Sequence, residues 1–505
     1  MTYPFFIKRD LHTSKINAQL RLAPASLVLT GFALLAGGCA VGPDYHAAEA
    51  PKVSAYTNRP LSKTNETNSA GGAAQQFMQD KEVAAQWWHS FGSAEIDRLV
   101  DAALAHNPSI ASAQAALRQA KANADAQRGS YFPTVQASYT PNRQRNAVGT
   151  ISPTLTSGDP VYTLHTAQLS ISYVPDVFGL NRRTVESLVA QEESQHFQLE
   201  ATYLTLAANV VTNAIQLSLI QAQIKSNEEI IAAAEKTLTM LTQQAKLGFS
   251  SGLDISAQET ALAQARLALP PLQKQLDQTK DMLAVLCGEF PSDSQIADID
   301  LATLTLPQEL PLSLPSSLIQ QRPDVRAAEA LVHAASAQVG VAIANRLPQF
   351  SISGNLGGTS TGFSHMFSAG NQFWSVAGGA TQTLLDFGTL KHKQTAAEAA
   401  LDQATAQYRS VVLTAFQNVA DSLFAIDADA KALQAAVDAE KSAKKTADLT
   451  KHQFESGFVG MQPVLAAEQA YQQAKLTRLQ NQAARYTDSA ALFQALGGGW
   501  WNRKI

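Results

Sequence analysis

The chain has 505 residues, of which 45% are hydrophobic and 16% are charged, and its formal net charge is −4. This composition predicts a folded protein with a sizeable apolar core and excludes a disordered chain. It also argues against a nucleic-acid-binding protein, because no concentration of Lys and Arg is available to neutralise a phosphate backbone.

The first 39 residues have the pattern of a secretion signal. Basic residues precede an uncharged apolar run from Leu22 to Gly38, and Cys39 follows the run. We therefore expect residues 1–38 to be a signal peptide. The end of the run resembles the bacterial lipobox, although Ala36 stands where that pattern prefers leucine. The resemblance implies that Cys39 carries a covalent lipid, diacylglycerol and an N-acyl chain, and that Ala40 permits sorting to the outer membrane.

The next segment, residues 39–86, is rich in Ala, Pro, Asn, Ser and Thr. This composition predicts an extended lipidated tether, with folding expected to start near Trp87. Beyond Cys39 we find no window of 18 apolar residues, so we expect no transmembrane helix and assign any membrane crossing to strands. The remaining cysteine, Cys287, lies in an apolar stretch and predicts a free buried thiol.

From residue 87 the sequence repeats itself. Pro108 opens an Ala/Gln-rich stretch that ends at Pro133, and Pro323 opens a similar stretch that ends at Pro348. Further on, residues 248–249 and 457–458 are both Gly-Phe, and matching positions continue at this offset of 209 residues. We therefore predict two copies of one unit. Their predicted bounds are 87–290 and 315–496, with a connector or equatorial segment at 291–314 and a flexible C-terminal tail at 497–505.

Each copy predicts the order helix, strand, loop, strand, long helix, sharp turn, helix. Residues 166–173 and 348–353 alternate apolar and polar side chains, which is typical of a wall with one apolar and one wet face. Four such strands cannot close a barrel, and an open sheet edge in lipid leaves backbone groups unpaired. The sequence therefore predicts a barrel shared between several chains.

The long helix expected at residues 181–247 is too long for a bilayer. At about 1.5 Å per residue it spans roughly 100 Å, about three times a hydrocarbon core. Its apolar positions alternate threes and fours, as do those of the returning helix, which is the spacing of coiled-coil packing. We therefore expect an α+β membrane protein whose coiled-coil helices project away from the membrane.

Four motifs together resemble the TolC-like outer membrane factors, in the lipoprotein branch that serves RND-type efflux pumps. They are Cys39-Ala-Val-Gly-Pro-Asp-Tyr45, Trp87-Trp88-x-x-Phe91, Arg322-Pro-Asp-Val325 and Leu385-Asp-Phe-Gly388. The resemblance implies a homotrimer with four strands per chain and twelve in total, continued by a helical periplasmic tunnel. It also implies a periplasmic adaptor and an inner-membrane RND pump as partners, outer-membrane lipid around the barrel, and small toxic or antibiotic-like compounds as cargo.

The same resemblance implies the site residues. In the family the hairpin tips dock on the adaptor, and the corresponding residues are Gly248, Phe249, Gly252, Leu253, Asp254, Gly457, Phe458, Gly460 and Pro463. An acidic residue before the second tip narrows the family's pore, and Asp448 matches that place. Lys444 lies four residues earlier, so a solvated Lys444–Asp448 pair is the alternative interpretation.

Catalytic signals are absent or better explained by structure. Residues 248–252 read G-x-S-x-G, but the polar helix expected before them is unlike the buried strand that a nucleophile elbow needs. No phosphate-binding loop or metal cluster is predicted, so we expect neither enzyme activity nor a metal. Two alternatives to an efflux duct stay open at this point: the duct of a type I protein secretion system and a non-conducting coiled-coil spacer of the envelope.

Overall fold

The computed structural model describes residues 40–503 except 48, 50, 60, 80 and 146–160. The signal peptide and Cys39 lie outside the described residues. The chain divides into two compact units. Unit 1 comprises residues 1–46, 122–189 and 333–402, and unit 2 comprises residues 47–121, 190–332 and 403–505.

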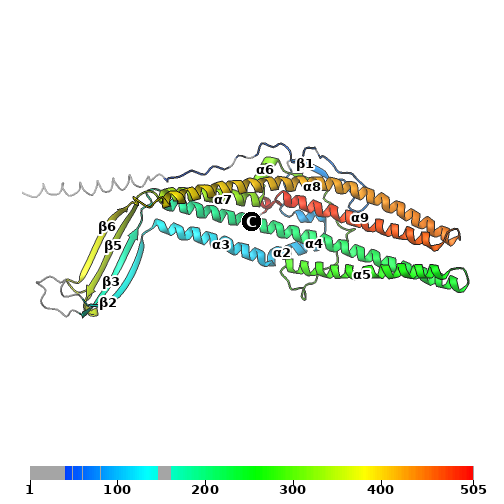
Figure 1. The fold of residues 1–505 in the computed structure, drawn as a ribbon, viewed down its shortest axis with the longest axis horizontal. Coiled ribbons are helices and arrows are strands. Elements are labelled where there is room, and N and C mark those ends of the chain that lie inside the picture. The colour runs from blue at the N-terminus through cyan, green and yellow to red at the C-terminus, as the bar shows by residue number, and fades with distance from the viewer. Residues whose placement is uncertain are drawn as a thin grey trace, which may run out of the picture. The chain divides into compact units, whose positions relative to one another are not determined.

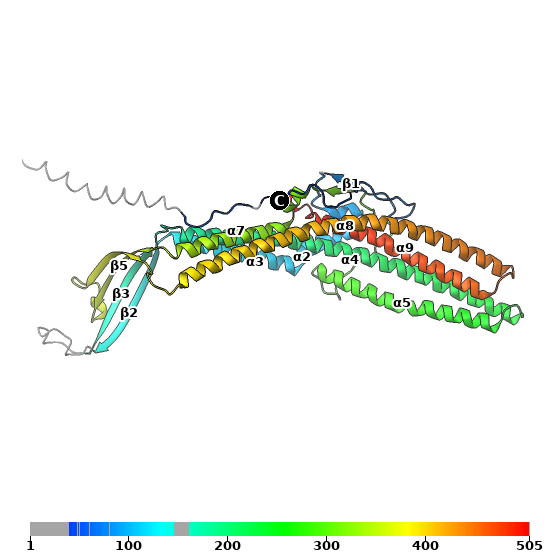
Figure 2. The same cartoon turned by 45° about the horizontal axis from the view of Figure 1, so that its top comes forward.

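Unit 1 is built on a four-stranded sheet with the order β2-β3-β5-β6. The strands are β2 (Thr134–Arg145), β3 (Val161–Tyr173), β5 (Gln349–Ser360) and β6 (Gln372–Thr381). All three pairings are antiparallel, and β3 of the first copy pairs with β5 of the second (Figure 2). Each copy therefore contributes two adjacent strands, as the sequence predicts.

Four helices adjoin the same end of this sheet. They are α3 (Pro108–Arg128), α4 (Leu180–Lys246), α7 (Pro323–Ala344) and α8 (Thr389–Glu455). Chain order places α3 before β2, α4 after β3, α7 before β5 and α8 after β6. The opposite end of the sheet carries the β5–β6 connection.

The Leu385-Asp-Phe-Gly388 motif makes the sharp entry into α8. The Asp386 carboxylate accepts hydrogen bonds from the backbone N–H groups of Leu390 (2.7 Å) and Gly388 (2.9 Å), which hold its pKa below the ordinary value. Phe387 has φ of 52°, in the left-handed region that non-glycine residues seldom adopt. The strained turn is held by the acidic cap at the start of the helix.

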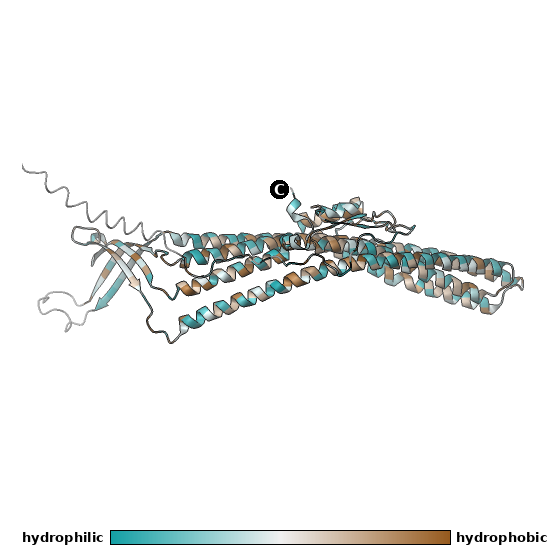
Figure 3. Cartoon of the chain, turned by 90° about the horizontal axis from the view of Figure 1, so that it is seen from above, coloured by the Kyte–Doolittle hydropathy of each residue, from teal (hydrophilic) through white to brown (hydrophobic). Residues whose placement is uncertain are grey.

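Unit 2 contains the two helical hairpins. The α4 helix turns into α5 (Gly252–Leu286), and α8 turns into α9 (Met461–Ala495), so that the helices of each hairpin lie side by side (Figure 1). Both long helices have 67 residues, and apolar residues recur along them among hydrophilic ones (Figure 3). One buried apolar cluster joins these helices to η1 (Trp87–Phe91) and α2 (Ala94–His106).

The predicted free thiol is confirmed in this unit. Cys287 is buried and unbridged, and its Sγ lies 3.5 Å from the carbonyl oxygen of Leu99. Burial raises the pKa of this thiol to about 11, so Cys287 acts as a small apolar residue of the core.

The expectation that folding starts near Trp87 is wrong. Strand β1 (Gln76–Gln79) pairs in parallel with β4 (Glu309–Leu312), which lies in the connector, and α6 (Pro315–Gln321) follows. Thr64 and Gln75 are buried before it. Four-residue segments are too short to show a periodic pattern and give no sequence signal for such long-range pairing, because each strand is stabilised only by the other.

The expectation of no apolar helical window after residue 39 is also wrong. By length and composition, α4, α7 and α8 are each apolar enough to cross a membrane. In α4 the apolar residues include Val210, Val211 and Leu217, whose side chains are fully buried in the core of unit 2. Such a helix is hydrophobic because protein covers it, so hydropathy alone does not separate a buried helix from a spanning one.

A buried arginine connects the N-terminal segment to α9. Arg485 is 1% exposed, and its guanidinium donates to the Gly71 carbonyl (2.7 Å), the Gln75 side-chain oxygen (3.0 Å) and the Thr64 hydroxyl (3.3 Å). Burial raises the pKa of Asp429, on α8, to about 7, and the nearby Asp488 carboxyl acts in the same direction, while Arg485 opposes it. The network therefore holds one carboxyl protonated near neutral pH.

We predict that Asp429→Asn flattens the pH dependence of stability. The folded chain keeps the Asp429 proton up to about pH 7, whereas the unfolded chain releases it near the ordinary aspartate pKa of 3.8. The folded state binds more protons in that window, so wild-type stability falls as the pH rises through it. Allowing for partial exposure, the variant gains on the order of 1 kcal/mol relative to wild type above this window.

Thermal unfolding followed by circular dichroism in detergent at pH 5 and pH 8 measures this difference. Asp438→Asn, at an exposed position on the same helix, is the matched control. If the unfolding midpoint of the wild type differs between the two pH values by no more than the midpoint of Asp429→Asn does, the prediction is wrong.

Candidate functional site

The four-stranded sheet has one apolar and one polar face. Register places Ala137, Leu169, Leu356 and Trp374 in one row across the strands, with Val135, Ile171, Gly354 and Val376 in the next row on the same face. Most of the large side chains in these rows are exposed, and Trp374 is 76% exposed. Apolar groups presented in this way suit hydrocarbon.

The opposite face of the sheet is polar. Gln136, Ser170, Asn355 and Ser375 form one row, and Thr166 and Thr359 share a hydroxyl hydrogen bond of 3.0 Å in another. Side chains of this kind suit water. The predicted sheet with one apolar and one polar face is therefore confirmed by the positions of its side chains.

The first hairpin tip ends α4 in a Schellman motif. The N–H of Phe249 donates to the Gln244 carbonyl (2.8 Å), and the N–H of Gly248 donates to the Ala245 carbonyl (3.0 Å). Gly248 has φ of 78°, which glycine adopts without steric cost. Ser251 then caps α5 in a capping box with Asp254. Because a helix precedes residues 248–252, their G-x-S-x-G pattern is a turn and lacks the strand of a nucleophile elbow.

The second tip repeats the first turn but not its cap. The N–H of Phe458 donates to the Gln453 carbonyl (2.9 Å), and Gly457 has φ of 76°. Gly460 is the N-cap residue of α9 and offers no side-chain hydrogen bond, and Pro463 lies in the first turn. The duplicated glycines are thus explained by the same backbone geometry in both copies.

The two tips contact each other within unit 2. Leu241, Met461 and Val464 form a small buried cluster that joins the α4 hairpin to the α9 hairpin. The Ser251 hydroxyl (2.6 Å) and the Ser251 backbone N–H (3.1 Å) donate to the Asp254 carboxylate and hold the pKa of Asp254 below its ordinary value. Around this contact the tip residues Phe249, Leu253 and Phe458 are largely exposed, Phe458 at 83%. The predicted tip residues therefore form one surface with protruding apolar side chains.

Asp448 is exposed on α8, and so is Lys444. Among the ion pairs of the described residues, none joins these two side chains. The geometry leaves the Asp448 carboxylate in solvent on one chain.

Residues 41–45 of the N-terminal motif dock through an arginine that sequence reasoning missed. Arg183, on α4 in unit 1, donates to the carbonyl of Val41 (3.1 Å) and the carboxylate of Asp44 (2.7 Å), and its side chain is 5% exposed. The Tyr45 ring stacks on His333 with 4.4 Å between centroids. Asp44 and Arg183 are 139 residues apart, so no local pattern announces their contact.

Arg322 explains the Arg-Pro-Asp-Val motif. Its guanidinium donates to both oxygens of Asp324 (2.9 and 2.6 Å) and to the carbonyl of Ala495 (3.0 Å), the last residue of α9. The start of α7 thus satisfies an open carbonyl at the end of α9, which is the expected use of a cation at a helix C-terminus.

The expectation of a flexible C-terminal tail is wrong for residues 497–503. The indole N–H of Trp500 donates to the Gln321 carbonyl (2.7 Å), and Asn502 donates to the Val83 carbonyl (2.9 Å). Glycines 497–499 all have positive φ, which lets the chain reverse here. The tail is ordered because its two anchoring side chains find buried carbonyl acceptors that sequence alone does not reveal.

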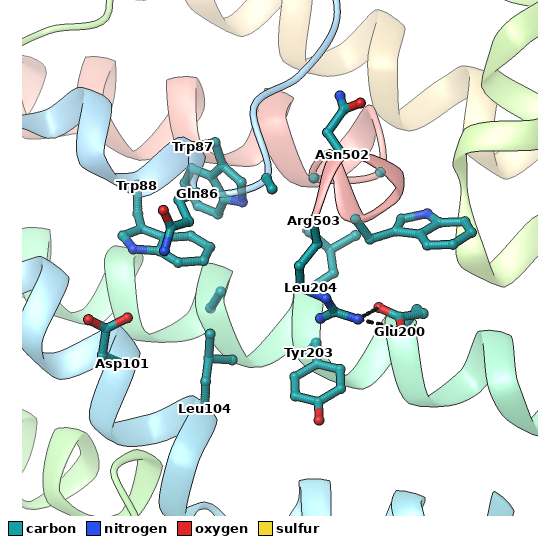
Figure 4. Close-up of a pocket in the computed structure, with 15 residues that line it drawn as sticks. Gln86, Trp87, Trp88, Asp101, Leu104, Glu200, Tyr203, Leu204, Asn502 and Arg503 are labelled. Carbon is teal, nitrogen blue, oxygen red and sulfur yellow. Dashed lines mark hydrogen bonds and ion pairs between the residues drawn. The ribbon is translucent and has the colours of Figure 1, made fainter. Parts of the chain in front are cut away.

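The tail also closes one end of a cavity of about 400 Å³ in unit 2 (Figure 4). Arg503 binds both carboxylate oxygens of Glu200 (2.6 and 2.8 Å), and its guanidinium lies 4.9 Å from the centre of the Tyr203 ring. Trp88 and Leu104 line the cavity from the other side. The ion pair and cation–π contact fix the tail on α4.

Comparison with known proteins identifies the family. The model of the outer membrane efflux protein family matches residues 99–289 and 314–498. The chain belongs to this family. The two matched ranges correspond closely to the two sequence copies.

Characterised relatives cover almost the whole chain. It is 28% identical over 481 residues to the antibiotic efflux pump outer membrane protein ArpC of Pseudomonas putida, covering 95% of this chain and 96% of that protein. It is also 28% identical to outer membrane protein OprJ of Pseudomonas aeruginosa, covering 93% and 94%. The chain is thus an outer-membrane protein of efflux.

Solved structures share the fold. The outer-membrane channel OprN superimposes with a TM-score of 0.81 at 25% identity, covering 92% of this chain and 100% of that one. The CmeC channel of Campylobacter jejuni gives 0.80 at 20% identity, covering 92% and 96%. The sheet and hairpins described above are therefore those of an outer-membrane channel subunit.

Proposed function

We propose that three copies of this chain close one twelve-stranded barrel in the outer membrane. The observation that carries the proposal is the open sheet with an exposed apolar face. Its outer strands β2 and β6 each have a neighbour on one side only among the described strands. In lipid such edges leave backbone N–H and C=O groups unpaired, so β2 of one copy pairs with β6 of the next.

Strand length fits this role. The four strands have 12, 13, 12 and 10 residues, and a tilted membrane strand needs about 9–11. The polar face then lines a water-filled lumen, and the helices that adjoin one end of the sheet continue it as a periplasmic tunnel. Cys39, as a lipidated residue, adds a second attachment to a chain that the barrel already holds in the membrane.

Incorporation of labelled palmitate tests the lipid on Cys39, and we expect Cys39→Ser to abolish it.

The cargo proposed is small toxic or antibiotic-like compounds, and the duct is passive. The names of the relatives support this class: ArpC is an antibiotic efflux pump protein and one TtgC is a toluene efflux pump protein, both of Pseudomonas putida. Energy comes from an inner-membrane pump of the RND type, joined to the duct by a periplasmic adaptor.

Deleting the gene is expected to lower the inhibitory concentration of several pump substrates by about fourfold or more, because export stops where the exit is missing. Purified protein is expected to give stepwise conductance in planar bilayers. An unchanged drug profile together with the loss of a secreted protein would instead assign the chain to protein secretion, and the absence of conductance would indicate a structural spacer.

The adaptor docks on the tip surface formed by Gly248, Phe249, Gly252, Leu253, Asp254, Gly457, Phe458, Gly460 and Pro463. Its exposed phenylalanines, Phe249 at 80% and Phe458 at 83%, are the side chains that gain most by burial. The glycines and caps hold the turns that present them.

Replacing both phenylalanines, Phe249→Ser and Phe458→Ser, is expected to weaken adaptor binding by about tenfold or more, because apolar anchors in an interface core carry most of its energy. Surface plasmon resonance with the cognate adaptor measures the affinity. Phe290→Ser, which changes an exposed phenylalanine just after the far end of α5, is the control. Equal affinity of the tip variant and the control would move the docking site elsewhere.

Asp448 narrows the pore in the proposed trimer. Three copies bring three carboxylates around the axis, where they repel one another and attract cations. Lys444 lies one turn away and forms no ion pair with Asp448 among the described contacts, so the carboxylate is available for this role.

Asp448→Ala is therefore expected to reduce cation selectivity and raise single-channel conductance by about twofold or more. Reversal potentials in a salt gradient across a planar bilayer give the selectivity. Asp438→Ala, ten residues away on the same helix, controls for loss of one carboxylate per chain. A variant with unchanged conductance and unchanged selectivity would remove Asp448 from the constriction.

A further inference from the structure

At the end of the sheet away from the helices, a loop covers part of the apolar face. The β5–β6 connection, residues 361–371, folds back over this face. Met366 is 5% exposed, and its carbonyl oxygen lies so close to Gly358 that a Cβ there would stand 2.1 Å away. Asn371 fixes the fold, because its side chain donates to the His365 carbonyl (2.7 Å) and its own carbonyl accepts from the Thr359 N–H (2.8 Å).

The connection brings an aromatic cluster together. The Phe363 ring lies edge-on to Tyr139 (5.7 Å between centroids) and to His165 (6.0 Å). The Tyr139 hydroxyl and His165 Nδ1 are 2.8 Å apart. Phe363 is 63% exposed. Rings with one polar and one apolar side are typical of the water–hydrocarbon boundary of barrel proteins.

Toward the middle of the sheet, the apolar face is hollowed. A cavity of about 450 Å³ is lined by Ala137, Ala167, Leu169, Leu356 and Phe367, together with residues Ser138, Gln168, Gly357 and Gln372. The two alanines make the floor low, and the larger apolar side chains form its walls. A shallow, open and mainly apolar hollow of this shape suits a flexible hydrocarbon chain.

Two arginines lie beyond the aromatic cluster on the same face. Arg143 pairs with Thr163 and Arg145 with Val161, four and six residues past Tyr139, so both share its face by strand alternation. Both are exposed, and neither has an ion-pair partner among the described residues. The strand and connection residues 134–145, 161–173 and 349–381 contain no Asp or Glu, and the β2–β3 connection, outside the described residues, contains Asp159. With two arginines and one aspartate in the sheet and its two connections, this end of a chain with net charge −4 carries a small positive charge.

We propose that this face binds a phosphorylated glycolipid of the outer leaflet, with lipid A chemistry. Arg143 and Arg145 bind its phosphates, the Tyr139–His165–Phe363 cluster contacts its sugars, and one acyl chain lies in the hollow. The proposal rests on the proposed function, which puts the helices in the periplasm and this end of the sheet at the outer surface. A glycolipid with two phosphates matches two unpaired guanidinium groups better than a zwitterionic phospholipid, whose ammonium cancels its charge.

The experiment uses the full-length purified channel in detergent and fluorescent lipid A as the probe. The double variant Arg143→Gln, Arg145→Gln is expected to raise the dissociation constant by about tenfold or more, because two charge-assisted contacts are lost. Ala167→Phe, which fills the hollow without changing charge, is expected to weaken binding as well. Arg118→Gln with Arg409→Gln removes two exposed arginines from helices and is expected to leave the affinity unchanged.

Two further probes separate lipid classes. Dephosphorylated lipid A and phosphatidylethanolamine are both expected to bind at least about tenfold more weakly than lipid A. Equal binding of either one, or equal loss in the helix control, would overturn the proposal. Single-channel conductance of the same variants separates failure of the lipid site from failure of the duct. If the channel conducts but its lipid A binding does not depend on the two arginines, only the lipid site is rejected. If the wild-type channel does not conduct, the duct itself is rejected.

Discussion

The structure depends on the alternation of side chains along four paired strands. Paired residues of neighbouring strands lie on the same face of the sheet. The register of β2, β3, β5 and β6 therefore places the apolar side chains of all four strands on one surface and the polar side chains on the other. A slip of one residue in any pairing would expose serines and glutamines to hydrocarbon and valines to water. The helices, turns and N-terminal contacts then serve to place this wall and to extend it.

The hairpins meet a different requirement, since they work in water. Their apolar residues recur at helical spacing and are buried by neighbouring helices, as Val210 and Leu217 of α4 are. Hydropathy does not tell such a helix from a membrane span, whereas burial of its apolar residues in the fold accounts for them without a membrane. One chain thus carries two kinds of apolar surface, one facing a neighbour in the fold and one facing solvent in the isolated subunit.

The sequence was informative where periodicity or duplication carried the signal. Period-two alternation located the strands, the 209-residue offset aligned the tips, and the tip glycines announced turns that the structure contains at Gly248 and Gly457. Contacts between distant segments were not predictable in this way. Arg183 with Asp44, β1 with β4 and Trp500 with Gln321 each join residues with no shared pattern, and their energy arises only once both partners are folded. The tip and pore roles came from family resemblance, and the arginines on the apolar face, Arg143 and Arg145, became visible only through register.

The two copies of the hairpin differ in how the returning helix is capped. The first copy caps α5 with its own Ser251 and Asp254, whereas α9 begins at Gly460, which has no side chain to cap it. Packing between the copies offsets this difference, because Met461, the first residue of α9, lies in one buried cluster with Leu241 of α4 and Val464. Burial of these apolar side chains stabilises the contact between the two hairpins beside their exposed phenylalanines.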